Sequence, residues 1–277
     1  MKHVTLPCGE SVAGLGQGTW HIGDAPDQRK EEIATLRRGI DLGLTLIDTA
    51  EMYGDGRSEQ LVGEAIAGRR SEVFIVSKVY PHNASRAAMP RSCEASLRRL
   101  RGDALDLYLL HWAGAVPIDE TVEAFEALRR AGKIRHWGVS NLDIDAVQEL
   151  WSTPAGRAVQ VNQVLYNLGE RGIEWDLLPW LRQRRVPVMA YSPFDEGRLL
   201  RARPLVAFGK KHGMTAAQAA LAWLLAQDGV IAIPKTGRHE RLEENAGALE
   251  RPLSKEQLEE LDRLFRPPEG ARALAML

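Results

Sequence analysis

The sequence of 277 residues has only two cysteines, Cys8 and Cys93, and they are far apart in the chain. Neither a disulfide framework nor a Cys-x-x-Cys zinc site is therefore expected, and two reduced thiols are typical of a cytoplasmic protein. Long apolar runs are also missing, because the first residues lack the core of a signal peptide and no stretch is long enough to span a bilayer. We therefore expect a cytoplasmic protein with no membrane partner.

An excess of charge of one sign is missing as well, since 36 lysines and arginines stand against 37 aspartates and glutamates, for a net charge of −1. This balance shows no electrostatic footprint for nucleic acid. The hydrophobic fraction of 44% is ordinary for a globular protein. No linker rich in proline, glycine or serine divides the chain, so we expect residues 1–277 to form one domain.

Short apolar segments alternate with amphipathic helical segments along the whole chain. Strands are expected at 45–48, 74–78, 105–111, 136–140, 159–163, 186–192 and 230–234. Helices are expected at 29–42, 58–66, 90–100, 121–131, 143–150, 173–184, 205–211, 216–226, 239–249 and 255–264. Such alternation indicates an α/β fold with a parallel sheet, and the length suits one (α/β)8 TIM barrel.

Two details complete this fold prediction. Residues 4–6 and 11–13 are expected to form an N-terminal β-hairpin, and extra helices are expected in the second half of the chain. Ser58 is a plausible N-cap for the helix that it begins.

A glycine-rich stretch, Gly14-x-Gly16-x-Gly18, raises the alternative of a doubly wound dinucleotide-binding fold. It fails the G-x-G-x-x-G spacing because position 19 is threonine, and it precedes Trp20 rather than a helix. We interpret it as the loop after a first barrel strand that ends at Leu15.

Polar residues stand at the carboxyl ends of the expected strands, where barrel enzymes place their active sites. Asp48, Lys78 and His111 end three of them, and Tyr53 follows Asp48 by five residues. A neighbouring ammonium group lowers the pKa of a tyrosine from about 10, an aspartate holds the lysine, and a histidine donates to a substrate oxygen. Together they form a general acid for a carbonyl oxygen. The carbonyl carbon then needs a hydride, which a nicotinamide cofactor supplies.

Two other enzyme classes fit less well. Short-chain dehydrogenases place tyrosine and lysine four residues apart on one helix, and no tyrosine here has a lysine four residues later. A metal-dependent barrel needs clustered carboxylates and histidines, whereas only Asp48 and His111 are candidates and Lys78 lies between them in sequence. We therefore expect no metal.

The chain resembles the aldo-keto reductase family along nearly its full length. The resemblance rests on the order and spacing of these motifs: Gly16-Gln17-Gly18-Thr19-Trp20, Asp48-Thr49-Ala50-Glu51-Met52-Tyr53-Gly54, Val76-Ser77-Lys78, Leu110-His111-Trp112, Gly138-Val139-Ser140-Asn141, Asn162-Gln163, Ala190-Tyr191-Ser192-Pro193 and Ile233-Pro234-Lys235. It implies a catalytic tetrad of Asp48, Tyr53, Lys78 and His111. Within the family, the motifs are most similar to those of small bacterial enzymes of the methylglyoxal-reductase type.

The resemblance also implies that the cofactor is NADPH/NADP+. Its implied contacts are Gly18, Thr19, Trp20, Asp48, Ser140, Asn141, Gln163, Tyr191, Ser192, Phe194, Gly197, Leu199, Lys235, Thr236, Arg241, Glu244 and Asn245. Lys235, Thr236 and Arg241 are assigned to the 2′-phosphate and Glu244 and Asn245 to the adenine. Lys235 and Arg241 flank the start of a helix, whose dipole favours an anion.

The expected function is therefore NADPH-dependent reduction of aldehydes or ketones, with methylglyoxal-type dicarbonyls or aromatic aldehydes as the small-molecule substrates. Trp20, Met52, Tyr80 and Trp112 are expected to line the substrate pocket, and the short tail 269–277 is expected to cover little of it. The resemblance favours a monomer. It also leaves open a nucleotide-sensing regulatory subunit with little turnover, since some relatives have that role.

Overall fold

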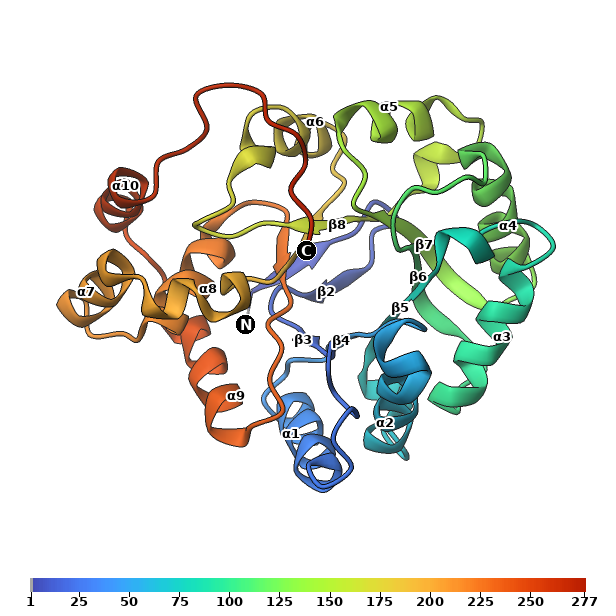
Figure 1. The fold of residues 1–277 in the computed structure, drawn as a ribbon, viewed down its shortest axis with the longest axis horizontal. Coiled ribbons are helices and arrows are strands. Elements are labelled where there is room, and N and C mark those ends of the chain that lie inside the picture. Colours follow the sequence, from blue (N-terminus) through green and yellow to red (C-terminus); the bar gives the residue numbers. More distant parts are fainter. Residues whose placement is uncertain (1) are drawn as a thin grey trace.

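The structure, a computed structural model, describes residues 2–277. At its centre is a sheet of eight parallel strands that follow one another in chain order (Figure 1). The strands are β3 Gln17–Gly18, β4 Leu46–Asp48, β5 Phe74–Val79, β6 Leu105–Leu110, β7 Ile134–Ser140, β8 Asn162–Leu165, β9 Val188–Tyr191 and β10 Val230–Ala232. A separate antiparallel hairpin, β1 His3–Thr5 with β2 Ser11–Ala13, precedes the sheet, as expected.

The sheet closes on itself between its first and last strands. Isolated parallel bridges join Leu15 to Ala232 and Gly18 to Lys235, which confirms the (α/β)8 barrel. A Cβ atom on Gly18 would lie 2.7 Å from the carbonyl oxygen of Ile233, and one on Gly16 would lie 2.8 Å from that of Leu46. Glycine is therefore needed where the first strand fits between its two neighbours.

This closure corrects the interpretation of residues 14–18 as a loop. The segment is the first barrel strand itself, and its glycines serve the close approach of backbones rather than a phosphate turn.

Helices surround the barrel, as the sequence predicts. Their bounds are α1 Arg29–Asp41, α2 Arg57–Ala65, α3 Met89–Leu100, α4 Ile118–Arg130, α5 Ile144–Ser152, α6 Leu177–Gln183, α7 Arg203–Lys211, α8 Ala216–Ala226, α9 His239–Ala246 and α10 Lys255–Leu264. The N-termini of α8 and α10 are fixed by capping boxes, begun by Thr215 and Ser254. No helix within residues 2–277 has the length and apolarity needed to cross a membrane.

Two local expectations are wrong. Ser58 is not an N-cap, because α2 begins one residue earlier after Gly56, and the Ser58 hydroxyl instead donates to the Thr19 side chain at 2.7 Å. The helix expected at 173–184 is shorter. A 3₁₀ turn, Gly172–Glu174, precedes it, and Asp176 then caps α6.

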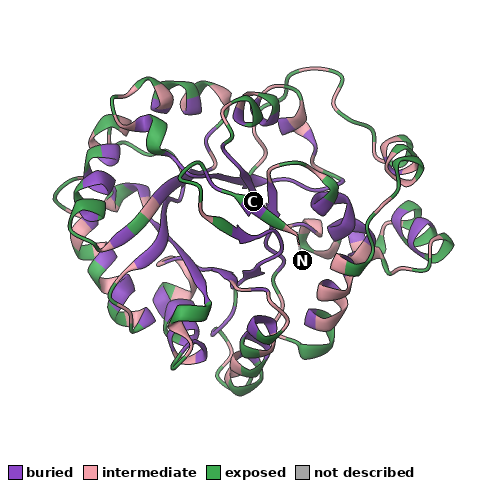
Figure 2. Ribbon diagram, turned by 180° about the vertical axis from the view of Figure 1, so that it is seen from behind, coloured by how far each residue is buried: buried purple, intermediate pink, exposed green. Residues whose placement is uncertain are grey.

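The core has two layers, and they orient the strand residues. An inner cluster fills the barrel and includes Leu46, Val76 and Leu109. An outer cluster, which includes Ile47 and Ile75, packs between the strands and the helices. Figure 2 shows the buried strands enclosed by helices whose outer faces are exposed. Alternate residues of each strand therefore point into the barrel.

Candidate active site

Side chains alternate between the inside and the outside of the barrel along β4 and β5, and this alternation brings the predicted catalytic residues together inside the barrel. Leu46 and Val76 point into the barrel, so Asp48 and Lys78, two residues further along each strand, point inward as well. His111 follows β6 directly and is two residues beyond the inward-pointing Leu109. All three predicted residues therefore meet at the carboxyl end of the barrel.

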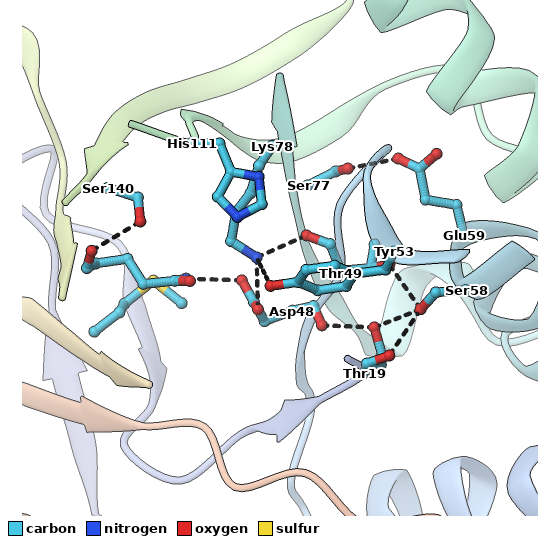
Figure 3. A network of polar contacts seen from close by, with 12 residues as sticks. Thr19, Asp48, Thr49, Tyr53, Ser58, Glu59, Ser77, Lys78, His111 and Ser140 are labelled. Carbon is cyan, nitrogen blue, oxygen red and sulfur yellow. Dashed lines mark hydrogen bonds and ion pairs between the residues drawn. The ribbon is translucent and has the colours of Figure 1, made fainter. Parts of the chain in front are cut away.

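The ammonium group of Lys78 is the centre of a hydrogen-bond network (Figure 3). It is fully buried and donates to Asp48 Oδ2 at 2.8 Å, to the Thr49 carbonyl at 2.9 Å and to Tyr53 Oη at 2.9 Å. An ammonium group has three donors, so all three are used. The position of the Lys78 Nζ atom is therefore determined by three acceptors, which lie at the end of β4 and in the turn that follows it.

The contact with Tyr53 restricts where the phenolic proton can lie. Because Lys78 donates to the phenolic oxygen, the proton of Tyr53 has to point elsewhere. No acceptor for it is present among residues 2–277, and the Tyr53 side chain lines an open cavity. The proton is therefore available to a molecule in that cavity.

Burial sets the charge states of this pair. It raises the pKa of Tyr53 above its ordinary value of 10.0, although the Lys78 ammonium opposes the rise. The sequence-based expectation of a lowered pKa is therefore wrong, because it considered the neighbouring charge and not the burial. Burial also disfavours the charge on Lys78, but the interactions with Asp48 and Tyr53 together outweigh it, and the pKa of Lys78 is raised. At neutral pH, Tyr53 is protonated and Lys78 is charged.

His111 is neutral in this site. Burial, assisted by the charge of Lys78, lowers its pKa to about 2. Its Nδ1 atom is buried and has no hydrogen-bond partner among the described residues. Since buried N–H groups are rarely left without an acceptor, we assign the proton to Nε2. The imidazole lies edge-on to the Tyr53 ring, with 5.9 Å between the ring centroids.

The ends of the later strands join this network. Gln163 donates from Nε2 to Asp48 Oδ1 at 2.8 Å, so each carboxylate oxygen of Asp48 has its own donor. Ser140 Oγ donates to the Gln163 carbonyl at 2.8 Å, and Tyr191 Oη donates to Asn141 Oδ1 at 3.0 Å. Gln163, a residue predicted to bind the cofactor, therefore also orients the Asp48 carboxylate.

A cavity of about 420 Å³ opens at the carboxyl end of the barrel. Most of the predicted site residues line it: Gly18, Thr19, Trp20, Asp48, Met52, Tyr53, His111, Trp112, Ser140, Asn141, Gln163, Tyr191, Ser192, Phe194, Gly197, Lys235 and Arg241. The sequence therefore identified the cavity through residues on β3, β4, β7, β8 and β9, on the segments that follow β4, β6, β9 and β10, and on α9.

Some predicted residues do not line the cavity. Lys78 lies behind Tyr53. Tyr80 packs against Trp112, which lines the cavity, and the centroids of these two rings are 5.9 Å apart. Leu199 is buried, and its neighbour Leu200 lines the cavity instead. The residues predicted to contact the outer part of the cofactor also lie outside the lining: Thr236, Glu244 and Asn245.

Other lining residues were not predicted as site residues: His21, Pro193, Glu196, Leu200, Ile233, Met276 and Leu277. Pro193 and Ile233 lie inside the motifs that identified the family, so that signal was available for them. The expectation for the tail is wrong, since Met276 and Leu277 reach the cavity wall and the chain end lies over the barrel (Figure 1). Residues 269–277 have no periodic pattern from which this position of the tail could be predicted.

Two cations mark one part of the cavity lining. Lys235 and Arg241 both line it, and neither makes an ion pair within residues 2–277. Burial lowers the pKa of Lys235, and the nearby Arg241 lowers it further, against the opposing effect of Glu32. Two like charges held close together without a carboxylate partner are an arrangement that favours an anionic ligand.

The loop after β9 has an unusual backbone at the cavity rim. Ser192, Asp195 and Glu196 all have positive φ values, of 48°, 51° and 51°. This left-handed conformation is costly for residues other than glycine, and such residues cluster at functional sites. Bonds from the Arg198 guanidinium to the Asp195 carboxylate, at 2.7 and 2.9 Å, help to hold it.

Comparison with known proteins is consistent with this geometry. The model of the aldo/keto reductase family matches residues 14–266. The methylglyoxal reductase YeaE of Escherichia coli is 53% identical over 272 residues, which cover 96% of each chain. Two structures of an aldo/keto reductase from Klebsiella pneumoniae, one with NADP and acetate and one with NADPH, each have a TM-score of 0.97 at 51% identity. They cover 100% of this chain, which covers 99% of theirs. The chain therefore belongs to the aldo/keto reductase family.

Proposed function

We propose that this protein reduces aldehydes and ketones to alcohols with NADPH, and that methylglyoxal-type dicarbonyls are its main substrates. The observation that carries the proposal is the bond from Lys78 Nζ to the Tyr53 oxygen, which directs the tyrosine proton into the cavity. The methylglyoxal reductase at 53% identity supports the substrate class, and the neighbours crystallised with NADP and NADPH support the cofactor.

The residues of the cavity fit a phosphorylated dinucleotide. Lys235 and Arg241 supply two unpaired cations for the 2′-phosphate, with the Thr236 hydroxyl nearby in the chain and Glu244 and Asn245 assigned to the adenine. The loop that carries Ser192, Phe194, Gly197 and Leu199 is assigned to the pyrophosphate. Ser140, Asn141, Gln163 and Tyr191 lie beside the tetrad and are assigned to the nicotinamide end. When bound, the reduced nicotinamide supplies a hydride to the substrate carbon.

In this proposal Tyr53 donates its proton to the carbonyl oxygen of the substrate. Lys78 holds the phenolic oxygen in place and stabilises the phenolate that remains. Asp48 keeps Lys78 charged and fixes its position. His111, neutral and with its proton on Nε2, donates a hydrogen bond that orients the carbonyl oxygen.

The cavity mouth suits a small, partly apolar carbonyl compound. Trp20, Met52 and Trp112 line it, and Tyr80 packs against Trp112. Met276 and Leu277 add apolar surface from the tail. This wall accepts a methyl group or an aromatic ring beside the carbonyl, so both methylglyoxal and aromatic aldehydes are assigned as substrates.

The direct test is NADPH consumption by the purified protein with methylglyoxal, with an aromatic aldehyde and with no substrate. We expect substrate-dependent loss of NADPH, and slower loss of NADH because NADH lacks the phosphate that Lys235 and Arg241 bind. No turnover despite tight NADPH binding would contradict the proposal and favour a nucleotide-sensing role.

The Arg241→Ala variant sharpens this test. Charge-assisted hydrogen bonds contribute about 1.5–3 kcal/mol, so the KM for NADPH should rise by about 10–100-fold while the KM for NADH stays unchanged. Arg201 is also exposed, lies outside the cavity and makes no ion pair within residues 2–277, so Arg201→Ala is the matched control. Equal effects of Arg241→Ala on both cofactors would refute the assignment of Arg241 to the phosphate.

The charge states predict an unusual pH profile. An ordinary histidine titrates near pH 6.5, but the pKa of His111 is lowered to about 2, so it is neutral at every working pH. The pKa of Tyr53 is raised above 10.0, so Tyr53 keeps its proton below that pH. With both substrates saturating, kcat should therefore show no inflection between about pH 5 and about pH 9. An acid limb near pH 6.5 that disappears in His111→Gln would show that His111 titrates in the working enzyme.

A further inference from the structure

A second cluster of reactive side chains lies at the opposite end of the barrel. Cys8 and Glu10 stand in the turn between β1 and β2, and His136 lies near the start of β7. The same strand ends at Ser140 in the active site, four residues and about 13 Å further along. The cluster is therefore separate from the cavity that holds the catalytic residues.

The three side chains converge on one point. His136 Nε2 lies 3.7 Å from Cys8 Sγ and 2.8 Å from Glu10 Oε2. All three potential ligand atoms lie within 4.8 Å of one another, and within residues 2–277 this is the only such group of three histidine, cysteine or acidic side chains. Cys8 is exposed, so the group is open to solvent.

The shared nitrogen decides between two chemical interpretations. In a nucleophilic triad the carboxylate and the nucleophile bind opposite nitrogens of the imidazole. Here both Cys8 and Glu10 contact Nε2, so Glu10 cannot orient the ring for proton transfer from the thiol. Ligands of one metal ion, by contrast, all face the same point.

The sulfur–nitrogen distance agrees with a tetrahedral ion, whereas Glu10 Oε2, at 2.8 Å from His136 Nε2, has to move away by about 0.6 Å to reach the ligand spacing of about 3.4 Å. With Zn–S near 2.3 Å and Zn–N near 2.0–2.1 Å, the sulfur and nitrogen of such a site lie about 3.6 Å apart. The observed separation of Cys8 Sγ and His136 Nε2 is 3.7 Å. Thiolate, imidazole and carboxylate are the zinc ligands of proteins, and the exposed side of the cluster leaves the fourth position to water.

The surroundings hold the three ligands in place. The backbone N–H of Cys8 donates to Gln160 Oε1 at 2.9 Å. The two ends of the turn are joined by a hydrogen bond from the backbone N–H of Leu6 to the carbonyl oxygen of Glu10, at 2.8 Å. Arg135 binds both oxygens of Glu10 at 2.8 Å and also binds Asp106 at 2.7 Å. Such outer contacts orient metal ligands, and the positive charge of Arg135 limits the affinity for a cation.

We propose that Cys8, Glu10 and His136 form a binding site for a divalent transition metal, with Zn²⁺ as the best-fitting ion. On binding, the Cys8 thiol releases its proton to solvent, and the metal takes the place of the hydrogen-bonding proton between His136 and Glu10. The metal then links the N-terminal hairpin to β7.

Co²⁺ is the probe for this site because its thiolate bond gives a charge-transfer band that a carboxylate or imidazole alone does not give. Untagged protein titrated with Co²⁺ should show this band with a stoichiometry of one, and Zn²⁺ should abolish it. Zn²⁺ should also protect Cys8 from iodoacetamide, and Cys93 is buried and does not compete.

Variants separate the site from adventitious binding. Cys8→Ser should remove the thiolate band and weaken Zn²⁺ binding, measured by competition with a chromophoric chelator, by about 100-fold. His136→Gln should weaken it similarly. The matched control is His212→Gln, because His212 pairs with Glu260 at 3.0 Å but has no cysteine within the ligand group. Zn²⁺ binding of equal strength in the parent and Cys8→Ser, or no thiolate band in the parent, would overturn the proposal.

Discussion

Replacing Tyr53 with phenylalanine is expected to lower kcat for methylglyoxal reduction by about 10²–10⁴-fold, which is the usual contribution of a general acid. The variant keeps the ring that packs edge-on to His111 and removes only the oxygen to which Lys78 donates. NADPH binding should stay within about twofold of the parent, because the assigned cofactor contacts lie on other residues.

The sequence provides a matched control for this substitution. Tyr108 is fully buried on the outer layer of β6, and its hydroxyl has no hydrogen-bond partner among the described residues. Tyr108→Phe should therefore leave both kcat and stability unchanged. NADPH binding is followed by fluorescence and turnover by NADPH absorbance. A parental kcat in Tyr53→Phe would remove Tyr53 as the acid, and a joint loss of cofactor binding would indicate a structural role.

Replacing Lys78 with methionine is expected to lower the free energy of unfolding by about 3–5 kcal/mol, because it leaves a buried charge without its partner. The Asp48 and Lys78 side chains are 3% and 0% exposed, so water replaces little of the lost contact. The remaining side-chain donor to Asp48 is Gln163. Turnover should fall as well, since Tyr53 loses the ammonium group that stabilises its phenolate.

A double variant tests this reason. Asp48→Asn combined with Lys78→Met removes both charges, so it should be more stable than Lys78→Met alone, although still inactive. Lys133→Met is the control for an exposed pair, since Lys133 lies 3.8 Å from Glu94 at the surface, and it should cost less than about 1 kcal/mol. Urea unfolding followed by circular dichroism measures all three. A double variant less stable than Lys78→Met would show that the charge of Asp48 does not carry the effect.

The convergence of Asp48, Lys78 and His111 could be predicted from the sequence because strand periodicity aligns these three residues. Asp48, Lys78 and His111 each end a readable apolar run, and parallel strands place such ends together. The motif spacing added Tyr53. The spacing of the motifs does not show how deeply Tyr53 is buried. Its burial is the reason why the pKa of Tyr53 is raised rather than lowered.

The first strand and the rim of the cavity were harder to predict. In the sequence, Gly16 and Gly18 look like turn residues. The reason for glycine at these positions is the close approach of the Leu46 and Ile233 carbonyl oxygens, which only the structure shows. Leu200 rather than Leu199 lines the cavity, and it follows a loop in which several residues have positive φ values that no sequence pattern indicates. The metal-ligand group of Cys8, Glu10 and His136 joins residues 126 positions apart, which no local spacing rule detects.

The closure of the barrel between Leu15 and Ala232 has a consequence during biosynthesis. A ribosome delivers the chain from its amino end, so one edge of the first strand stays unpaired until more than 200 further residues have emerged. Unpaired strand edges promote association between nascent chains. Here that edge is short and rich in glycine, since β3 spans only Gln17–Gly18. The glycines that allow the barrel to close therefore also make the unpaired edge of the first strand less prone to pair with another nascent chain.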